Sequence, residues 1–280
     1  MNTPHPFYDN SQIKTGRFIA NVLKRTLKNK GACAYSAISG FIPGHGALNI
    51  HYPEAGICVI TAQGITTHFP YLKGQDIPMP VAHMTSVGIT RWLKEKYQME
   101  GFVEVESGDI VVDCGSFVGG FARGAAEKAK AVYAFEPSPS NHKALLKNIE
   151  SFDNIKANAM GLYNETKTTT FNLSDTHVDD SLLTPDAGAG TGKSVEVQLM
   201  TMDDWAKSEN IQQVDFMKLE AEGVENEVLE GIQNLPVKKF AIDCSPERDN
   251  ISNMPELQTE LEKRGYECRS RKYMLFAKKG

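Results

Sequence analysis

A glycine turn and the acidic residue that follows it are the part of this chain best suited to bind a ligand. Residues 110–119 read IVVDCGSFVG, in which a short β-branched run leads into a turn containing Gly115 and Gly119. Glycines at such a strand-to-helix turn let a ligand approach the backbone closely. A second apolar run ends at Glu136, and an acid in that place can accept hydrogen bonds from both ribose hydroxyls. The pattern predicts adenosine binding by a doubly wound α/β domain.

The spacing of the turn indicates which adenosine cofactor is bound. A nicotinamide or flavin site would show G-x-G-x-x-G, whereas this turn reads D-x-G-x-x-x-G from Asp113 to Gly119. An acid at the start of the turn would repel a pyrophosphate, but it would suit the ammonium and sulfonium groups of S-adenosylmethionine. We therefore expect S-adenosylmethionine. A tight turn in an unrelated α/β protein is the alternative.

The cofactor is expected to follow the carboxyl ends of three neighbouring strands. Its methionine part should lie at the turn, its ribose at Glu136 and its adenine near the end of the third strand, around Met160. Glu136 could instead cap the next helix, since Pro137 and Ser138 begin it. The expected cofactor-binding residues are Asp113, Gly115, Phe117, Val118, Gly119, Glu136, Asn158 and Ala159.

A cluster of acids follows the fourth strand of this pattern, where residues 218–225 read KLEAEGVE. Alternation along a strand would place Glu220 and Glu222 on the same side. A carboxylate here could act as a general base, so we expect Glu222 in that role, with Glu220 second and Lys218 paired to one of these acids. Glu225 fits the start of the next helix. Structural ion pairing is the alternative explanation of the cluster.

A metal ion is a second possibility for the same region. Glu220 or Glu222 could hold Mg²⁺ together with Asp243 or Glu247, because these acids end or follow neighbouring strands. The alternative bases are His142 and His177.

The composition sets the class of protein that must position these residues. The chain has 280 residues, 41% of them hydrophobic, and a net charge of −5, which is enough for one large domain or a domain with an appendage. Its mild acidity argues against a nucleic-acid partner. Five scattered cysteines without a C-x-x-C pair fit a reducing, cytoplasmic compartment. We expect neither a signal peptide nor a transmembrane segment.

Strand and helix patterns alternate regularly from residue 109 onward, which predicts a mostly parallel sheet with helices on both faces. A terminal hairpin is expected at 266–271 and 273–278, and two extra strands at 168–173 and 195–200. The other expected strands are 110–113, 131–136, 154–160, 214–220 and 238–244, and the expected helices are about 120–129, 139–150, 224–233 and 254–264.

The region before this domain is expected to form a cap that helps to build the acceptor pocket. We divide the chain into a cap at 1–102 and a cofactor-binding domain at 103–280. A basic helix is expected to begin near Ser11 and to end by Gly31, with a solvated face or a membrane or partner contact as alternatives. Short strands at 57–61 and 65–69 and a helix at 85–98 complete the cap.

Residues 187–194 read AGAGTGKS, which satisfies a relaxed phosphate-loop pattern. A phosphate loop needs a buried strand before it and a helix after it. Here polar residues precede the motif and a strand-like pattern follows it. We interpret the segment as a hairpin loop.

Four ordered blocks in residues 103–280 resemble the FkbM family of S-adenosylmethionine-dependent methyltransferases. These blocks are IVVDCGSFVGGFA, FEPSPSNHKALLKNI, VQLMTMDDW and VDFMKLEAEGVENEVLEG. In the third block Asp203 takes the place of the family's acid. The resemblance implies a class I methyltransferase fold, Rossmann-like, for residues 103–280, and the expected N-terminal cap lies outside it.

The resemblance also implies O-methylation of a small molecule, a sugar or glycan, or a natural product.

Three departures from the family pattern stand out: Ser116-Phe117 replaces alanine-asparagine, Glu220 replaces aspartate, and Asp243-Cys244-Ser245 replaces Glu-x-His. An inactive binding module and methylation of a macromolecule are the rival hypotheses. A homo-oligomer is compatible with the sequence.

Overall fold

The structure is a computed structural model that describes residues 48–62, 64–70, 89–174, 182 and 190–280. It divides into two compact units, Met1–Trp92 and Leu93–Gly280. Helix α4 (Ile89–Lys96) spans the division. The predicted basic helix lies outside the described residues. No helix within the described ranges is long and apolar enough to cross a membrane.

The described part of the first unit is an antiparallel sheet of three strands in the order β1-β2-β3. The strands predicted at 57–61 and 65–69 are confirmed, while the first strand was not predicted. Their bounds are β1 (Leu48–Glu54), β2 (Ile57–Ala62) and β3 (Ile65–Pro70).

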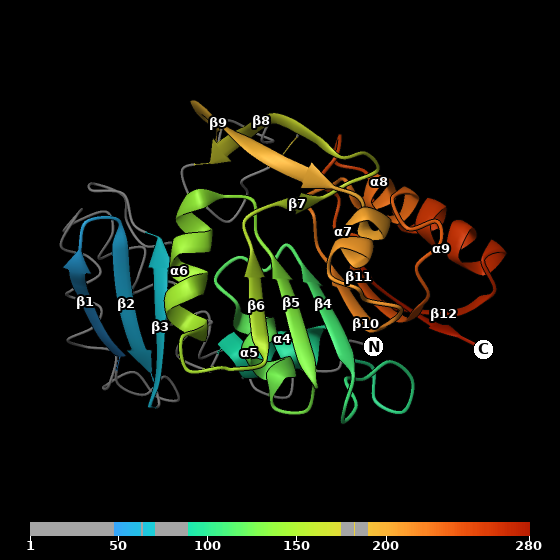
Figure 1. The fold of residues 1–280 in the computed structure, drawn as a ribbon, viewed down its shortest axis with the longest axis horizontal. Helices are drawn as coiled ribbons and strands as arrows, with labels where there is room; N and C mark the ends of the chain where they lie inside the picture. The colour runs from blue at the N-terminus through green and yellow to red at the C-terminus, as the bar shows by residue number, and fades with distance from the viewer. Residues whose placement is uncertain (1–47, 63, 71–88, 175–181, 183–189) are drawn as a thin grey trace. The chain divides into compact units, whose positions relative to one another are not determined.

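The second unit is built around a seven-stranded sheet, and the predicted α/β fold is confirmed (Figure 1). The strand order is β12-β13-β11-β10-β4-β5-β6, with five parallel strands and a terminal antiparallel hairpin. The parallel strands are β4 (Ile110–Cys114), β5 (Ala131–Phe135), β6 (Ile155–Asn158), β10 (Val214–Leu219) and β11 (Val237–Asp243), and the hairpin is β12 (Tyr266–Arg271) with β13 (Met274–Lys279).

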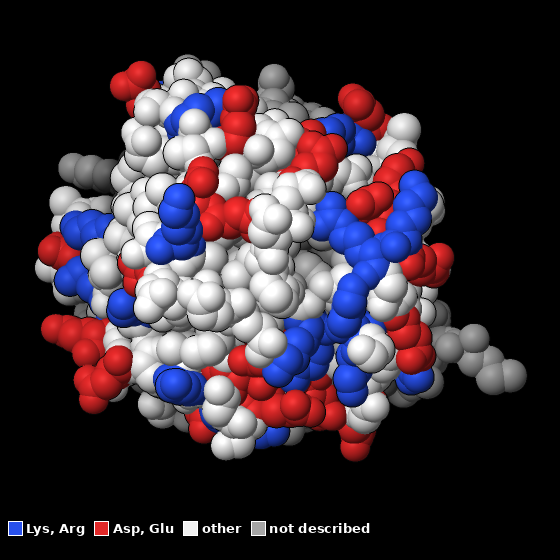
Figure 2. All heavy atoms as spheres, turned by 45° about the vertical axis from the view of Figure 1, so that its right-hand side comes forward, with Lys and Arg blue, Asp and Glu red and all other residues white. Residues whose placement is uncertain are grey.

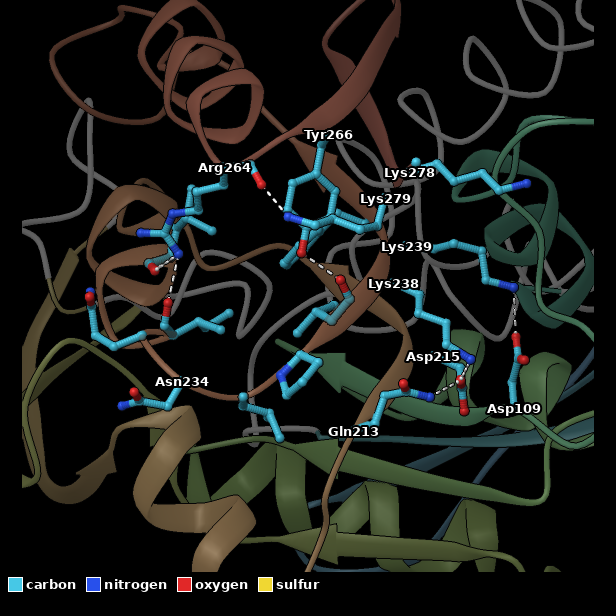
Figure 3. Close-up of a pocket in the computed structure, with 18 of the residues that line it drawn as sticks. Asp109, Gln213, Asp215, Asn234, Lys238, Lys239, Arg264, Tyr266, Lys278 and Lys279 are labelled. Atoms are coloured by element: carbon cyan, nitrogen blue, oxygen red, sulfur yellow. Dashed lines mark hydrogen bonds and ion pairs between the residues drawn. The ribbon is translucent and has the colours of Figure 1, made fainter.

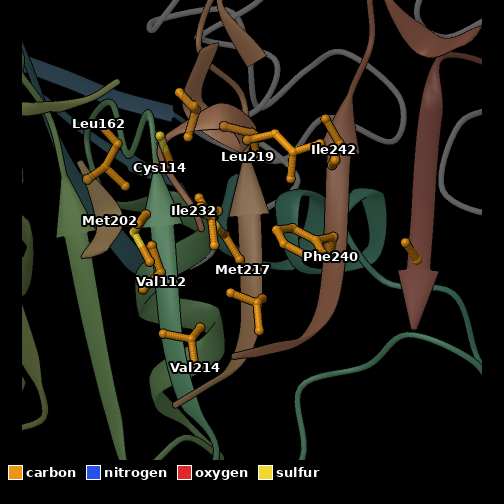
Figure 4. Packing of buried hydrophobic residues seen from close by; sticks show 14 of the residues in the cluster. Val112, Cys114, Leu162, Met202, Val214, Met217, Leu219, Ile232, Phe240 and Ile242 are labelled. Atoms are coloured by element: carbon orange, nitrogen blue, oxygen red, sulfur yellow. The ribbon is translucent and has the colours of Figure 1, made fainter. Parts of the chain in front are cut away.

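Alternate residues of each strand enter different cores, because successive side chains point to opposite faces of a sheet. Val112 and Met217 belong to the core shown in Figure 4, whereas Val111 and Phe216 belong to the other. The first core also contains residues of α7 (Met202–Ser208), α8 (Glu225–Glu230) and α9 (Met254–Lys263). The second contains residues of α5 (Gly120–Ala126) and α6 (Pro139–Ile149). The sheet is therefore covered by helices on both faces, as expected.

A third sheet interrupts the alternation, in the order β7-β9-β8. Its strands are β7 (Gly161–Leu162), β8 (Lys167–Ser174) and β9 (Gly190–Met200). Residues 190–194, predicted as part of a hairpin loop, instead begin the long strand β9, so that part of the prediction was wrong. Because the motif continues into a strand rather than a helix, the structural setting of a phosphate loop is missing there.

Helix α7 was not predicted as a helix. Thr201 caps it by accepting a hydrogen bond from the Asp204 N–H at 3.0 Å. The neighbouring Asp203, the acid of the third motif block, accepts hydrogen bonds from the N–H groups of Gln233, Asn234 and Leu235. Asp203 thus closes the turn after α8 and has a structural role.

Figure 2 shows basic and acidic side chains interspersed on the face where the carboxyl-terminal elements come forward.

Candidate functional site

The glycine turn packs directly against the end of strand β10. Gly115 and Gly119 take φ values of 72° and 82°, which favour glycine. A Cβ atom on Gly115 would lie 1.8 Å from the backbone oxygen of Glu220. The turn therefore needs glycine both for its conformation and for its close approach to Glu220. The residues expected at the donor site and at the acceptor site are thus in contact at this point.

Glu136 follows β5 and is only 5% exposed. One carboxylate oxygen accepts a hydrogen bond from the Phe117 N–H at 2.8 Å, and the other accepts one from the Ser138 N–H at 2.9 Å. The carboxylate thus joins the glycine turn to the start of α6. Asn141 also donates to the oxygen that Ser138 contacts, at 3.5 Å. These contacts agree with the alternative role of Glu136 at the helix start, and the ribose contact stays a prediction.

Phe117 adopts a left-handed conformation with a φ of 51°. Such a conformation is unusual for a bulky side chain, and backbone strain of this kind often occurs at functional sites. The neighbouring Val118 is completely buried, and its carbonyl accepts a hydrogen bond from Asn148. Of these two expected pocket residues, only Phe117 has a partly exposed side chain.

Asn158 and Ala159, expected near the adenine, lie at the carboxyl end of β6. Asn158 is half-buried and donates a hydrogen bond to the Ala134 carbonyl at 3.3 Å. Ala159 is exposed just beyond the strand. Both residues therefore stand at the same edge of the sheet as the glycine turn.

Asp113 lies within β4 and is 0% exposed. Its carboxylate accepts a hydrogen bond from the Ser116 hydroxyl at 2.8 Å and pairs with the Lys218 ammonium at 3.3 Å. The charge that we expected to face the cofactor is thus engaged inside the protein.

Lys218 connects this buried acid to the glycine turn. Its ammonium group donates to the carbonyls of Gly115, at 2.5 Å, and Cys114, at 3.1 Å, and it pairs with Glu220 at 3.2 Å. Burial alone would lower the pKa of Lys218, but the Asp113 and Glu220 carboxylates outweigh it and raise the pKa. Lys218 therefore stays charged and holds the turn against β10.

Lys96 is a member of this cluster that the sequence did not reveal. Its ammonium group lies 2.9 Å from a Glu220 oxygen and 2.7 Å from an Asp243 oxygen. The Tyr97 ring lies beneath both ammonium groups, 4.7 Å from that of Lys96 and 5.2 Å from that of Lys218. The predicted pairing of Lys218 with Glu220 occurs, but Lys96, from a distant part of the chain, shares the carboxylate.

Glu220 and Glu222 differ in structure, although alternation was expected to place them alike. Strand β10 ends at Leu219, so the strand pattern does not extend to Glu222 and this part of the argument was wrong. Burial would raise the pKa of Glu220, but Lys96 and Lys218 lower it well below its usual range. Glu222 instead lies in a turn with a left-handed φ of 49°, next to Gly223 at 92°.

Glu225 holds this turn in place. One of its carboxylate oxygens accepts hydrogen bonds from the N–H groups of Ala221, at 2.8 Å, and Gly223, at 3.2 Å. The other accepts a hydrogen bond from Asn253 at 2.7 Å. Burial raises the pKa of Glu225. Its position at the start of α8 agrees with the structural role expected from the sequence.

The Mg²⁺ alternative finds no support in this arrangement. The Lys96 ammonium lies between Glu220 and Asp243, where the shared cation would have to bind. No group of three or more His, Cys, Asp or Glu side chains with the arrangement of a metal site occurs among the described residues. Of the alternative bases, His142 is half-buried on α6, where burial lowers its pKa, and His177 lies outside the described residues.

A cavity of about 720 Å³ opens at the opposite, amino-terminal end of β10 and β11 (Figure 3). Its lining includes Asp109, Asp215, Lys238 and Lys239, and Figure 3 shows these side chains paired with one another. None of the expected site residues lines it. The size of a cavity therefore does not identify the site in this fold, where ligands are expected at the carboxyl ends of the strands.

Comparison with known proteins gives a match to one family. The sequence signature described as the Methyltransferase FkbM domain matches residues 113–268, more than half of the chain. This range includes the glycine turn, Glu136 and the acids after β10. No curated protein matches the chain.

Solved structures provide more distant likenesses. A methyltransferase FkbM from Methylobacillus flagellatus is 16% identical, with a TM-score of 0.44 over 70% of this chain and 52% of that one. M. jannaschii TYW2 in complex with AdoMet is 14% identical, with a TM-score of 0.42 over 83% and 91% of the two chains. M. capricolum TrmK in complex with S-adenosylhomocysteine is 13% identical, with a TM-score of 0.37 over 62% of each. The present chain spans about half of the first of these proteins.

Proposed function

Because the chain belongs to the FkbM methyltransferase family, we propose that it transfers a methyl group from S-adenosylmethionine to a hydroxyl oxygen. The family supports methyl transfer as the general activity. The observation that carries the choice of donor is the contact between the glycine turn and Glu136, through the Phe117 N–H. The contact supports the proposed ribose site, because the Glu136 carboxylate lies beside backbone that a ligand can approach.

S-adenosylmethionine would supply an activated methyl group on a sulfonium. Transfer of that methyl group to the acceptor oxygen would leave S-adenosylhomocysteine, whose sulfur would keep the electron pair of the broken carbon–sulfur bond. The protein must hold the acceptor oxygen in line and remove its proton. Positioning and proton removal are both established sources of rate enhancement.

We assign proton removal to Glu222. Lys218 stays protonated and Glu220 stays ionised between two ammonium groups, so neither suits a base that must take up a proton. Glu222 lies in the same loop, partly exposed, and its strained turn is held by Glu225. Lys218 is then a positioning residue. Glu222 is thus the base that we expected from the sequence.

The proposed acceptor is a hydroxyl of a small molecule, a sugar or glycan, or a natural product, as the family resemblance implies. A cytoplasmic location and the absence of a nucleic-acid partner remain predictions from composition. The cap at 1–102 and a homo-oligomeric state also remain predictions.

Calorimetric titration with S-adenosylhomocysteine tests the proposal. We expect micromolar binding by the wild type, weakened at least tenfold, or about 1.4 kcal/mol, in Glu136→Ala and Glu136→Gln. Glu209→Ala is the matched control, because Glu209 makes an ion pair with Lys156 on the surface at 3.1 Å. ATP and NAD should bind to none of these proteins.

Absence of S-adenosylhomocysteine binding by a folded wild type would overturn the proposal. Binding that Glu136→Gln leaves unchanged would contradict the placement of the ribose. Binding without turnover on any hydroxyl acceptor would instead favour the rival hypothesis of an inactive binding module.

A further inference from the structure

We propose that Glu220 binds the α-ammonium group at the methionine end of the methyl donor, and that Lys96 positions it for this contact. The inference rests on the proposed function, because it takes S-adenosylmethionine as the donor. It assigns to Glu220 the contact that the sequence suggested for Asp113. Glu220 then binds the methyl donor and does not act as the general base.

Glu220 lies beside the glycine turn. The backbone of Glu220 is so close to the glycine turn that a Cβ atom on Gly115 would lie 1.8 Å from the Glu220 oxygen. The Lys218 ammonium also contacts both the Gly115 carbonyl and the Glu220 carboxylate. A ligand whose methionine end lies along the turn therefore passes beside Glu220.

Glu220 is also accessible to a ligand, whereas Asp113 is not. The side chain of Asp113 is 0% exposed, and its oxygens face the Ser116 hydroxyl and the Lys218 ammonium. The side chain of Glu220 is 30% exposed. Of the two acids in contact with Lys218, only Glu220 can reach a ligand without rearrangement of the core.

The cluster around Glu220 contains more acids than lysines. Asp113, Glu220 and Asp243 contribute three carboxylates to the cluster, whereas Lys96 and Lys218 contribute two ammonium groups. This excess of one carboxylate favours the α-ammonium group of the ligand, rather than the α-carboxylate on the same carbon, as the group that faces the cluster. A carboxylate that is held ionised is a good partner for an ammonium ion, because a hydrogen bond between charged groups is stronger than one between neutral groups.

Lys96 acts through Glu220. Its ammonium lies 2.9 Å from one Glu220 oxygen, while Lys218 lies 3.2 Å from the other, so the carboxylate is fixed between two cations. Asp243 anchors Lys96 in turn, at 2.7 Å. Loss of Lys96 frees one side of the Glu220 carboxylate and so disturbs its orientation toward the turn.

A pair of ligands separates this contact from the rest of the donor site. S-adenosylhomocysteine carries the amino-acid end, whereas 5′-methylthioadenosine keeps the adenosine and sulfur but lacks that end. We expect Glu220→Gln to weaken S-adenosylhomocysteine at least tenfold and 5′-methylthioadenosine less than twofold in calorimetric titrations. Lys96→Met should show the same selectivity with a smaller loss, of about threefold to tenfold.

Conservative variants and matched controls complete the experiment. Glu220→Asp and Lys96→Arg should restore binding to within about threefold of the wild type, because each keeps the charge. Lys94→Met, on the same helix, removes an ammonium that pairs with Glu127, and Glu230→Gln removes a surface acid that binds Asn164. Both controls should bind the two ligands as the wild type does.

Equal losses for both ligands in Glu220→Gln would overturn the inference, because they would indicate a general structural defect. Unchanged S-adenosylhomocysteine binding in that variant would also overturn it. If the wild type binds neither ligand, the proposed function itself fails. If it binds both but Glu220→Gln does not distinguish them, only the present inference fails.

Discussion

Two charged clusters lie at opposite ends of the same strands and resemble each other in composition. At the carboxyl end, Lys218 pairs with Asp113 and Glu220. At the amino end, Lys239 pairs with Asp109 at 3.0 Å and with Glu106 at 3.1 Å. In each case a buried lysine on a central strand joins two acids.

The clusters differ in what they hold together. Lys239 also donates to the Glu104 carbonyl, so it ties the segment before β4 to β11. Lys218 instead contacts a glycine turn, and its partner Glu220 precedes a turn in which Glu222 is left-handed. A buried ion pair by itself therefore indicates only a role in the stability of the fold. A close backbone approach and local strain beside the ion pair are what indicate a site.

The cavity lies at the amino-terminal cluster, because Glu106, Asp109 and Lys239 are among its lining residues. Its lining includes Lys238 and Asp215, which pair at 2.8 Å, and Asp215 also accepts the Ile110 N–H. The contact between Lys238 and Asp215 joins the beginnings of β11 and β10 (Figure 3). The contact between Asp215 and the Ile110 N–H joins β10 to β4. We therefore attribute this cluster to the stability of the fold.

The largest expected effect concerns Glu222, the proposed base at the carboxyl end. Glu222→Gln should lower the rate of methyl transfer by about 10²–10⁴-fold, because an amide cannot take the acceptor's proton. Its affinity for S-adenosylhomocysteine should not change. The rate is measured with labelled S-adenosylmethionine and the first hydroxyl acceptor found by screening. Turnover within threefold of the wild type would remove Glu222 from the mechanism.

At the amino end, Lys239→Met should lower the free energy of unfolding by about 3–5 kcal/mol, because it leaves Asp109 without its buried partner. The folded fraction should still bind S-adenosylhomocysteine with wild-type affinity. Lys218→Met should lose comparable stability and also lose binding, since the glycine turn is no longer held. Denaturant unfolding and calorimetry measure the two quantities. Loss of affinity in folded Lys239→Met would contradict the distinction between the clusters.

The pH dependence of stability gives a smaller effect. The pKa of Glu220 is lower in the folded protein than its unfolded value of about 4.3. The stability that its ion pairs contribute is therefore present above pH of about 4.3 and is lost as the pH falls through the folded-state pKa. At pH 7, Glu220→Gln should be less stable than the wild type by about 1 kcal/mol, and the difference should shrink at low pH. A difference that grows on acidification would refute the ion-pair explanation.

The smallest effect is expected at Phe117. Asparagine adopts the left-handed conformation more easily than phenylalanine, so Phe117→Asn should raise the free energy of unfolding by about 0.5–1 kcal/mol. Thermal unfolding with a Phe117→Leu control separates backbone strain from loss of the ring. Destabilisation of Phe117→Asn by more than about 1 kcal/mol would show that packing of the ring outweighs the strain.

The sequence predicted the five parallel strands and the terminal hairpin because their apolar runs are short, β-branched and separated by helical patterns. It missed strand β7, since Gly161–Leu162 is too short to show a pattern. It also missed α7, although Thr201 and Asp204 have the spacing of a helix cap. The glycine-rich segment at 190–194 was misassigned because its pairing with β8 depends on tertiary contacts.

At the site, the motif residues could be predicted but their partners could not. Lys218 and Glu220 lie together in one strand block, whereas Lys96 is 124 positions from Glu220 and belongs to no motif. The sequence also could not show that Asp113 is buried, because its neighbour Lys218 comes from another strand. The charge state of each acid depends on such distant partners, so the assignment of roles required the structure.

Hydrogen–deuterium exchange with and without S-adenosylhomocysteine tests most directly which end of the strands is the site. We predict slower exchange on ligand addition in residues 113–119, 136–138, 158–160 and 220–223, at the carboxyl ends of the strands. Exchange around the cavity, in residues 213–215 and 233–239, should not change. Protection confined to the cavity residues would contradict the account, because it would place the ligand at the amino-terminal cluster.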